Sequence, residues 1–206
     1  MPKHGSKWLR NQFLELTPQE QEEYLNDWDI HISAKFARWA YAEVPLTERA
    51  RRAALVVIGC DRSAPWTTRF LLAELDRTWQ ERIGSFVISG LGRKLRWHDA
   101  IVARLLGLFD NSDAHESVRA ISLHVLGHCL MFCPAREREW FMDRMRSMCD
   151  QAIWDDSSPD MRMCACIGAY YLRGYEERLS ELSRDDASDD LGNSVAEHAE
   201  MYAVSA

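Results

Sequence analysis

The stretch "SVRAISLHVLGHC", Ser117–Cys129, carries two patterns at once. Arg119 precedes Gly127 by eight residues, and the residues between them are mostly small or apolar. His124 and His128 lie four residues apart, a spacing that places both side chains on one face of a helix. The stretch is therefore either one helix of a packed stack or one side of a metal site.

Too few ligand side chains of this stretch share one helical face to form a metal site. A zinc centre takes four ligands, or three and a water molecule. Cys129 and Cys133 fall on a different helical face from His124 and His128. No Glu follows the first histidine, as the metalloprotease motif requires. We therefore expect no metal site and no cofactor, and we keep His124 and His128 as weak candidates for an alternative function, a metal-dependent enzyme.

The arrangement around Arg119 recurs along the chain. Residues 97–174 twice show an apolar helix, a polar turn, and an apolar-Arg dipeptide that opens a second helix of small and apolar residues. Val118-Arg119 and Met161-Arg162 are 43 residues apart. An Arg also precedes a Gly by eight residues at Arg51 and Gly59, Arg82 and Gly90, and Arg119 and Gly127. Such periodicity is typical of helical repeat proteins.

The pattern resembles the HEAT-repeat family of armadillo-type α-solenoids, whose units are pairs of antiparallel helices of about 40–47 residues. The resemblance covers residues 47–174 and is clearest over 97–174. It implies an all-α fold, a HEAT-like stack of antiparallel helix pairs with extra N-terminal helices. Stacking is required because one helix pair cannot bury both of its apolar faces.

Helix start signals support the all-α class, and alternating strand patterns are scarce. Thr17–Glu20 form a capping box, and the helix that it opens is expected to reach Val44. Ser112 or Asp113 is expected to cap the helix that contains the opening stretch. Further starts are predicted at Thr47, Pro65, Pro134 and Ser158.

The pattern predicts a single all-α helical-repeat domain over residues 1–183. Residues 1–44 would form N-terminal capping helices, and residues 47–183 would form repeat-like helix pairs. Residues 184–206 follow the acidic run "SRDDASDD" and are expected to be an acidic C-terminal tail.

Composition limits the class of protein. The 206 residues are 47% apolar and 28% charged, which is typical of a soluble globular protein. No apolar run is long enough to span a bilayer or to serve as a signal peptide. We therefore expect a cytoplasmic protein with six reduced cysteines and no membrane partner.

The net charge of −7 is unevenly distributed. Residues 1–104 hold 16 Lys and Arg against 13 Asp and Glu, whereas residues 105–206 hold 9 against 19. The acidic balance argues against general nucleic-acid binding. It predicts instead a protein partner with a basic surface.

Eight tryptophans offer candidate contacts for such a partner. Trp39, Trp79, Trp140 and Trp154 lie in amphipathic patterns and are expected to pack in the core. The others of interest lie near helix starts in basic surroundings, and Trp and Arg are the usual residues of binding hot spots. The predicted partner-binding residues are Trp66, Arg93, Lys94, Arg96, Trp97, Asp155 and Asp156.

The candidate residues, together with the catalytic motifs that the sequence lacks, limit the possible function. No Gly-rich phosphate loop, nucleophile elbow or partnered carboxylate pair is present, so an enzyme is the less favoured class. We expect a non-catalytic protein-protein binding module, an adaptor or an inhibitor of the immunity-protein type. The alternative is a nucleic-acid-binding or DNA-repair protein of HEAT-like fold, which would use the basic residues 82–104 and Asp99 beside Trp97 as its catalytic acid.

Overall fold

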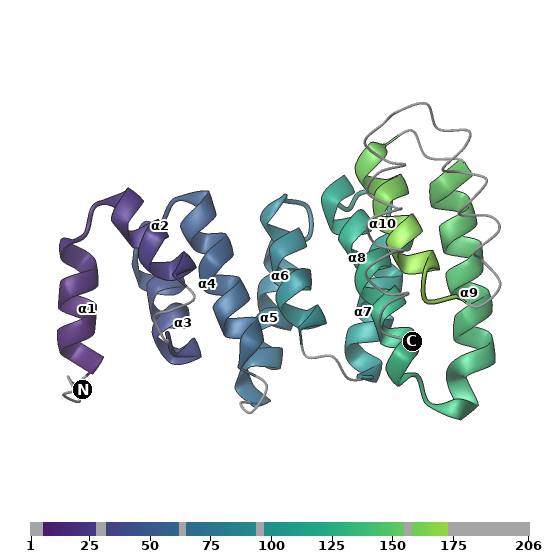
Figure 1. Cartoon of the computed structure of the whole chain (residues 1–206), viewed down its shortest axis with the longest axis horizontal. Coiled ribbons are helices and arrows are strands. Elements are labelled where there is room, and N and C mark those ends of the chain that lie inside the picture. The colour runs from purple at the N-terminus through teal and green to yellow at the C-terminus, as the bar shows by residue number, and fades with distance from the viewer. Residues whose placement is uncertain (1–5, 28–31, 62–64, 94–96, 155–157, 173–206) are drawn as a thin grey trace, which may run out of the picture. The chain divides into compact units, whose positions relative to one another are not determined.

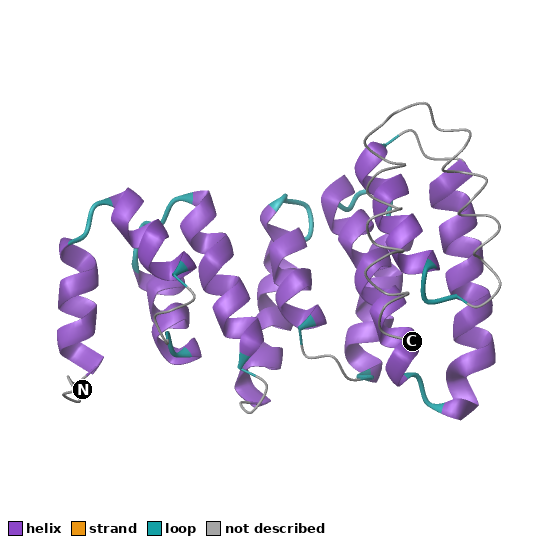
Figure 2. Cartoon of the chain, in the orientation of Figure 1, coloured by secondary structure: helices purple, strands orange, loops and turns teal. Residues whose placement is uncertain are grey.

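The computed structural model describes residues 6–27, 32–61, 65–93, 97–154 and 158–172. All regular elements in these ranges are helices (Figure 2), so the predicted all-α class is confirmed. The helices, labelled in Figure 1, are α1 (Ser6–Glu15), α2 (Pro18–Asn26), α3 (Ala34–Glu43), α4 (Glu48–Cys60), α5 (Pro65–Thr78), α6 (Ile83–Gly92), α7 (Asp99–Asp110), α8 (Glu116–Cys129), η1 (Leu130–Phe132, a 3-10 helix), α9 (Ala135–Trp154) and α10 (Pro159–Ala169).

The chain divides into two compact units. Unit 1 comprises residues 1–78 and 86–94, and unit 2 comprises residues 79–85 and 95–206, so α6 belongs in part to each. The predicted acidic tail, 184–206, lies outside the described residues. None of the described helices is both long and apolar enough to cross a membrane.

The core of unit 1 begins at Phe13 of α1, which is almost fully buried. Its ring makes edge contacts with Tyr24, Phe36 and Trp39, at centroid distances of 5.6, 5.3 and 6.2 Å. The buried amide of Gln21 donates a hydrogen bond to the Phe13 carbonyl at 3.1 Å. These contacts attach α1 to α2 and α3.

The helix that opens at Thr17 does not reach Val44, contrary to our prediction. Its capping box is confirmed, because the Thr17 side chain accepts from the Glu20 N–H and the Glu20 carboxylate accepts from the Thr17 N–H. However, α2 ends at Asn26, and α3 begins with its own cap, in which the Ser33 hydroxyl accepts from the Phe36 N–H at 3.2 Å. The stripe of aromatic residues at helical spacing, Tyr24, Phe36 and Trp39, is therefore divided between α2 and α3.

The hairpins α3–α4 and α7–α8 each carry an arginine, at positions 68 residues apart, that contacts the aromatic residue ten positions before it. Arg51 donates to the Tyr41 hydroxyl at 3.2 Å, and its guanidinium lies 5.1 Å from the centre of that ring. Arg119 donates to the Phe109 carbonyl at 3.1 Å and lies 5.8 Å from the Phe109 ring. Each arginine thus contacts the helix before its own, ten residues back in the chain.

The two second helices also begin at equivalent positions. Thr47 caps α4, and His115 caps α8 by accepting the Ser117 N–H at its Nδ1, 3.2 Å away. The prediction of Ser112 or Asp113 as this cap is therefore wrong. An imidazole is an unusual cap, which is why the residue preferences of N-caps did not indicate it.

Glycines bring helix backbones into direct contact in both units. A Cβ atom placed on Gly59 of α4 would lie 2.5 Å from the Cα of Gly90 in α6. One placed on Gly127 of α8 would lie 2.6 Å from the Cα of Gly168 in α10. Neither position has room for a side chain, and in both cases the obstructing atoms belong to the backbone.

The surroundings of the two contacts also match. A Cβ on Gly90 would lie 3.1 Å from the Leu55 carbonyl oxygen, and one on Gly168 would lie 3.2 Å from that of Leu123. Leu55 and Leu123 each precede their own helix's contact glycine by four residues. The helix that lies between the two contacting helices in the chain adds an apolar side chain, Leu71 of α5 in unit 1 and Met145 of α9 in unit 2.

The glycine contact gives a stability prediction. We expect Gly127→Ala to destabilise the protein by at least about 1–3 kcal/mol, the usual cost of overpacking, because two backbones must separate. Gly107 of α7 is the matched control, since it is exposed and a Cβ there meets nothing within 4 Å. Gly107→Ala is expected to stabilise by about 0.5–1 kcal/mol. Urea unfolding measures both, and equal free energies of unfolding for the two variants would contradict the contact.

Candidate binding surfaces

Three residues of unit 2, Trp97, Trp140 and Phe141, form what we call the aromatic cluster. The Trp97 ring lies edge-on to Phe141 at 5.0 Å, and its Nε1–H donates to the Asp99 carboxylate at 2.5 Å. Phe141 is fully buried. Trp140 contacts Phe141 at a centroid distance of 6.1 Å, yet 54% of its surface is exposed. The cluster therefore holds one tryptophan in place and presents another to solvent.

The prediction that Trp140 packs in the core is wrong. The buried face of α9 carries Phe141, Met145 and Met148. Successive residues of a helix are rotated by about 100°, so Trp140 faces outward with the charged side chains of Glu139 and Asp143. The spacing of Phe141, Met145 and Met148 in the sequence could have indicated that Trp140 lies off the buried face of the helix.

Other exposed apolar side chains lie nearby in the sequence. Met131 and Phe132, both in η1, are 52% and 43% exposed. Exposed apolar side chains that gather in one region mark interaction sites more often than scattered ones do. The segment from η1 to the first half of α9 thus carries three of the four large exposed hydrophobic side chains in the described part of unit 2, and Tyr170 is the fourth.

Trp66, a predicted binding residue, lies in the first turn of α5 and is half-buried. The Arg38 guanidinium of α3 lies 5.3 Å from the Trp66 ring and 5.5 Å from the Phe70 ring. Tyr41 contacts Phe70 edge-on at 6.0 Å. Trp66 is therefore part of an arginine-aromatic layer between α3 and α5.

A buried carboxylate ends this layer. Glu74 is 5% exposed and accepts a hydrogen bond from the Tyr41 hydroxyl at 2.5 Å. Arg77 lies 3.5 Å from the same carboxylate, and Arg51 donates to the Tyr41 hydroxyl. Burial, followed by the hydrogen bond to Glu74, raises the pKa of Tyr41 to about 12. The phenol is protonated at neutral pH, so it can donate its O–H to the buried carboxylate of Glu74.

Of the remaining predicted binding residues, only Arg93 lies within the described residues. Arg93 is exposed just after the end of α6. Lys94, Arg96, Asp155 and Asp156 lie outside the described residues. Trp66 and Trp97 belong to different units.

The acidic surplus of the second half also lies mainly outside the described residues. Residues 155–157 and 173–206 together hold eleven Asp and Glu against three Arg. Charge complementarity with a basic partner therefore remains an argument from the sequence.

The two histidines of α8 are in contact. Their Nε2 atoms are 3.0 Å apart, and their ring centroids are 4.9 Å apart. The Tyr171 hydroxyl lies 3.2 Å from Nδ1 and 3.3 Å from Nε2 of His128. Burial lowers the pKa of His128. No group of three or more His, Cys, Asp or Glu side chains in the described ranges is arranged to hold a metal ion.

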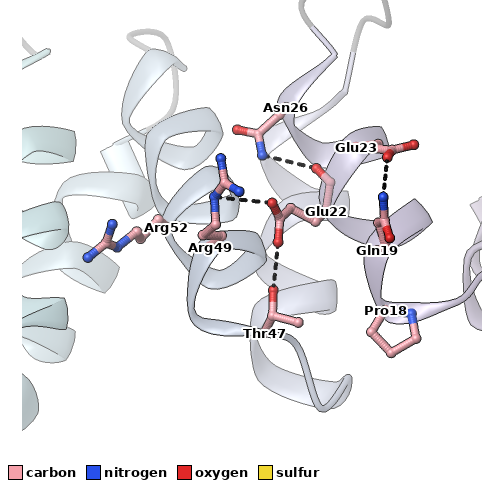
Figure 3. Close-up of a pocket in the computed structure, with 8 residues that line it drawn as sticks. All are labelled: Pro18, Gln19, Glu22, Glu23, Asn26, Thr47, Arg49 and Arg52. Atoms are coloured by element: carbon pink, nitrogen blue, oxygen red, sulfur yellow. Dashed lines mark hydrogen bonds and ion pairs between the residues drawn. The ribbon is translucent and has the colours of Figure 1, made fainter.

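A groove of about 830 Å³ lies between α2 and α4 (Figure 3). Glu22 is its central residue, with one carboxylate oxygen 3.2 Å from Arg49 Nε and the other accepting from the Thr47 hydroxyl at 3.2 Å. Arg52 points away from Glu22, and its guanidinium lies 3.8 Å from the centre of the Phe86 ring. Glu22 already has an ion pair with Arg49 and a hydrogen bond from Thr47, so the groove is a polar junction between two helices.

Comparison with protein families, with curated proteins and with solved structures found no match for this chain. The functional argument therefore rests on the residues and contacts described above.

The Tyr41–Glu74 pair gives a second prediction. We expect Tyr41→Phe to destabilise the protein by about 1.5–3 kcal/mol, because it removes the hydrogen bond from a buried carboxylate. Tyr24→Phe is the matched control, since burial alone raises the pKa of Tyr24. Chemical denaturation compares the two variants, and an equal effect on both would show that Tyr41 contributes packing only.

Proposed function

We propose that this chain is a HEAT-like helical-repeat protein that binds another protein without catalysis, and that the aromatic cluster of unit 2 is its principal contact. The observation that carries the proposal is the 54% exposure of Trp140 beside the buried Phe141.

The repeat part of the proposal is supported by contacts that recur at one offset. The arginines, the caps and the contact glycines of α4 and α8 correspond over 68 residues. Each of these helices meets a glycine of a later helix. In helical repeat proteins, such units share a core with their neighbours and present an extended surface for binding.

The binding part is supported by the chemistry of the cluster. Tryptophan dominates binding hot spots because it buries a large surface at a small cost in side-chain entropy. Trp140 is exposed, and its neighbour Phe141 is fully buried. Trp97 is fixed against Phe141 and Asp99. A partner would therefore meet one large apolar side chain on a rigid base.

A basic protein is the partner class that fits the charge of the chain. The second half carries the acidic surplus, and opposite charge accelerates encounter and excludes partners of like charge. An adaptor and an inhibitor of a basic enzyme or toxin share this chemistry.

The test first identifies the partner and then replaces Trp140, the proposed contact residue. The full-length chain is used to capture its partner from the native host, and the pair is reconstituted from purified components. We expect Trp140→Ala to weaken binding by about thirtyfold or more, the effect of losing a hot-spot residue. Trp8→Ala is the matched control, because Trp8 is similarly exposed, at 43%, but belongs to α1 of unit 1. It should retain wild-type affinity.

Two outcomes would contradict the proposal. A reconstituted complex that Trp140→Ala binds as tightly as wild type would remove the cluster from the interface. A shift of labelled duplex DNA at moderate salt, lost on substitution of Arg93, would favour the nucleic-acid alternative built on residues 82–104.

A further inference from the structure

The histidine pair of α8 has a geometry that the helical spacing alone did not reveal. Residues four apart on a helix share a face, but the distance between their nitrogens depends on both side-chain rotamers. In this protein the Nε2 atoms of His124 and His128 approach to 3.0 Å. At this distance one Nε2–H donates a hydrogen bond to the other Nε2, and a metal ion bound by both nitrogens would displace that proton.

From this we infer that His124 and His128 chelate a divalent transition-metal ion, such as Ni²⁺, Cu²⁺ or Zn²⁺, through their Nε2 atoms. Metal–imidazole bonds are about 2.0–2.1 Å long. Two such ligands at angles between square and tetrahedral lie roughly 2.9–3.4 Å apart, and the observed separation falls within this interval. Modest rotations of the two rings would aim both lone pairs at one ion.

Tyr171 completes the surroundings of the pair. Its hydroxyl lies 3.2 Å from Nδ1 of His128. The hydroxyl is nearly equidistant from the two ring nitrogens of His128, so it lies over the face of the ring and is not in line with the Nδ1–H. The same hydroxyl lies 3.3 Å from Nε2 of His128, so it is also close to where the ion would be held.

The equivalent helix of unit 1 shows that packing does not require these imidazoles. At the 68-residue offset, α4 has Val56 and Cys60 in place of His124 and His128. It nevertheless makes the corresponding glycine contact, with Gly90 of α6. The glycine contact therefore does not depend on the two imidazoles, although in unit 2 they contact each other and Tyr171.

The chemistry of the pair selects the class of ion. Imidazole nitrogens suit nickel, copper and zinc, whereas magnesium and calcium prefer oxygen ligands. With two protein ligands the ion keeps positions for water or for a donor from elsewhere. Such a site exchanges its metal readily, and it departs from our expectation from the sequence that the chain has no metal site.

The experiment titrates untagged full-length protein, freed of metal by a chelator that is then removed, with Ni²⁺ and separately with Zn²⁺ in a calorimeter. We expect one ion per chain for wild type and for His98→Gln, whose histidine is exposed and remote from the pair in sequence. His124→Val, which installs the residue found in α4, should lose this binding while keeping the wild-type helical content.

Thermal unfolding provides a second readout. Saturating Ni²⁺ should raise the melting temperature of wild type but not of His124→Val, because an ion that binds only the folded chain stabilises it. The inference is overturned if wild type binds no ion at millimolar concentration, if folded His124→Val binds as wild type does, or if Mg²⁺ produces the same shift. Each outcome is independent of whether the partner proposed above is found.

Discussion

Backbone contact between glycines is the constraint on which the other features of each unit depend. At Gly127 and Gly168 the chains of α8 and α10 touch, with no side chain between them. Side-chain packing between helices usually tolerates small shifts, because side chains can adjust their rotamers. Two backbones in contact have no such adjustment, so the register of α10 against α8 is fixed.

The histidine pair owes its surroundings to this register. His128 follows Gly127 by one residue, and Tyr171 follows Gly168 by three. Fixing one glycine against the other therefore brings the Tyr171 hydroxyl to the His128 ring. In unit 1 the contact of Gly59 with Gly90 similarly places Arg52 of α4 over the Phe86 ring of α6. The polar and aromatic contacts are consequences of the close approach of the helices.

The sequence indicated the class of fold and several helix starts, because caps and apolar periodicity are local properties. The arginine-glycine spacing also pointed to equivalent helices in the two hairpins. It could not reveal that Ser33 begins a new helix, since the aromatic stripe continues across the break. Nor could it give the cap at His115, which depends on an imidazole turning back to the Ser117 N–H.

The candidate site was harder to predict than the fold. Trp140 and Phe141 are neighbours in a helix with an apolar stripe, and only the position of the stripe separates the exposed ring from the buried one. The histidines were recognised as sharing a face, but the approach of their nitrogens depends on rotamers that spacing does not determine. Sequence patterns locate faces well and distances poorly.

The contacts of Gly59 with Gly90 and of Gly127 with Gly168, which we call the glycine seam, also affect how the chain can evolve. A duplicated hairpin would carry its arginine, its cap and one of the two contact glycines, but the partner glycine lies in a later helix, so a copy forms another tight interface only where that helix also presents a glycine. A point substitution at a seam glycine, by contrast, removes an interface without providing a replacement. A substitution at a seam glycine therefore disturbs two helices at once, so new chemistry is more readily acquired on the helix faces beside the seam.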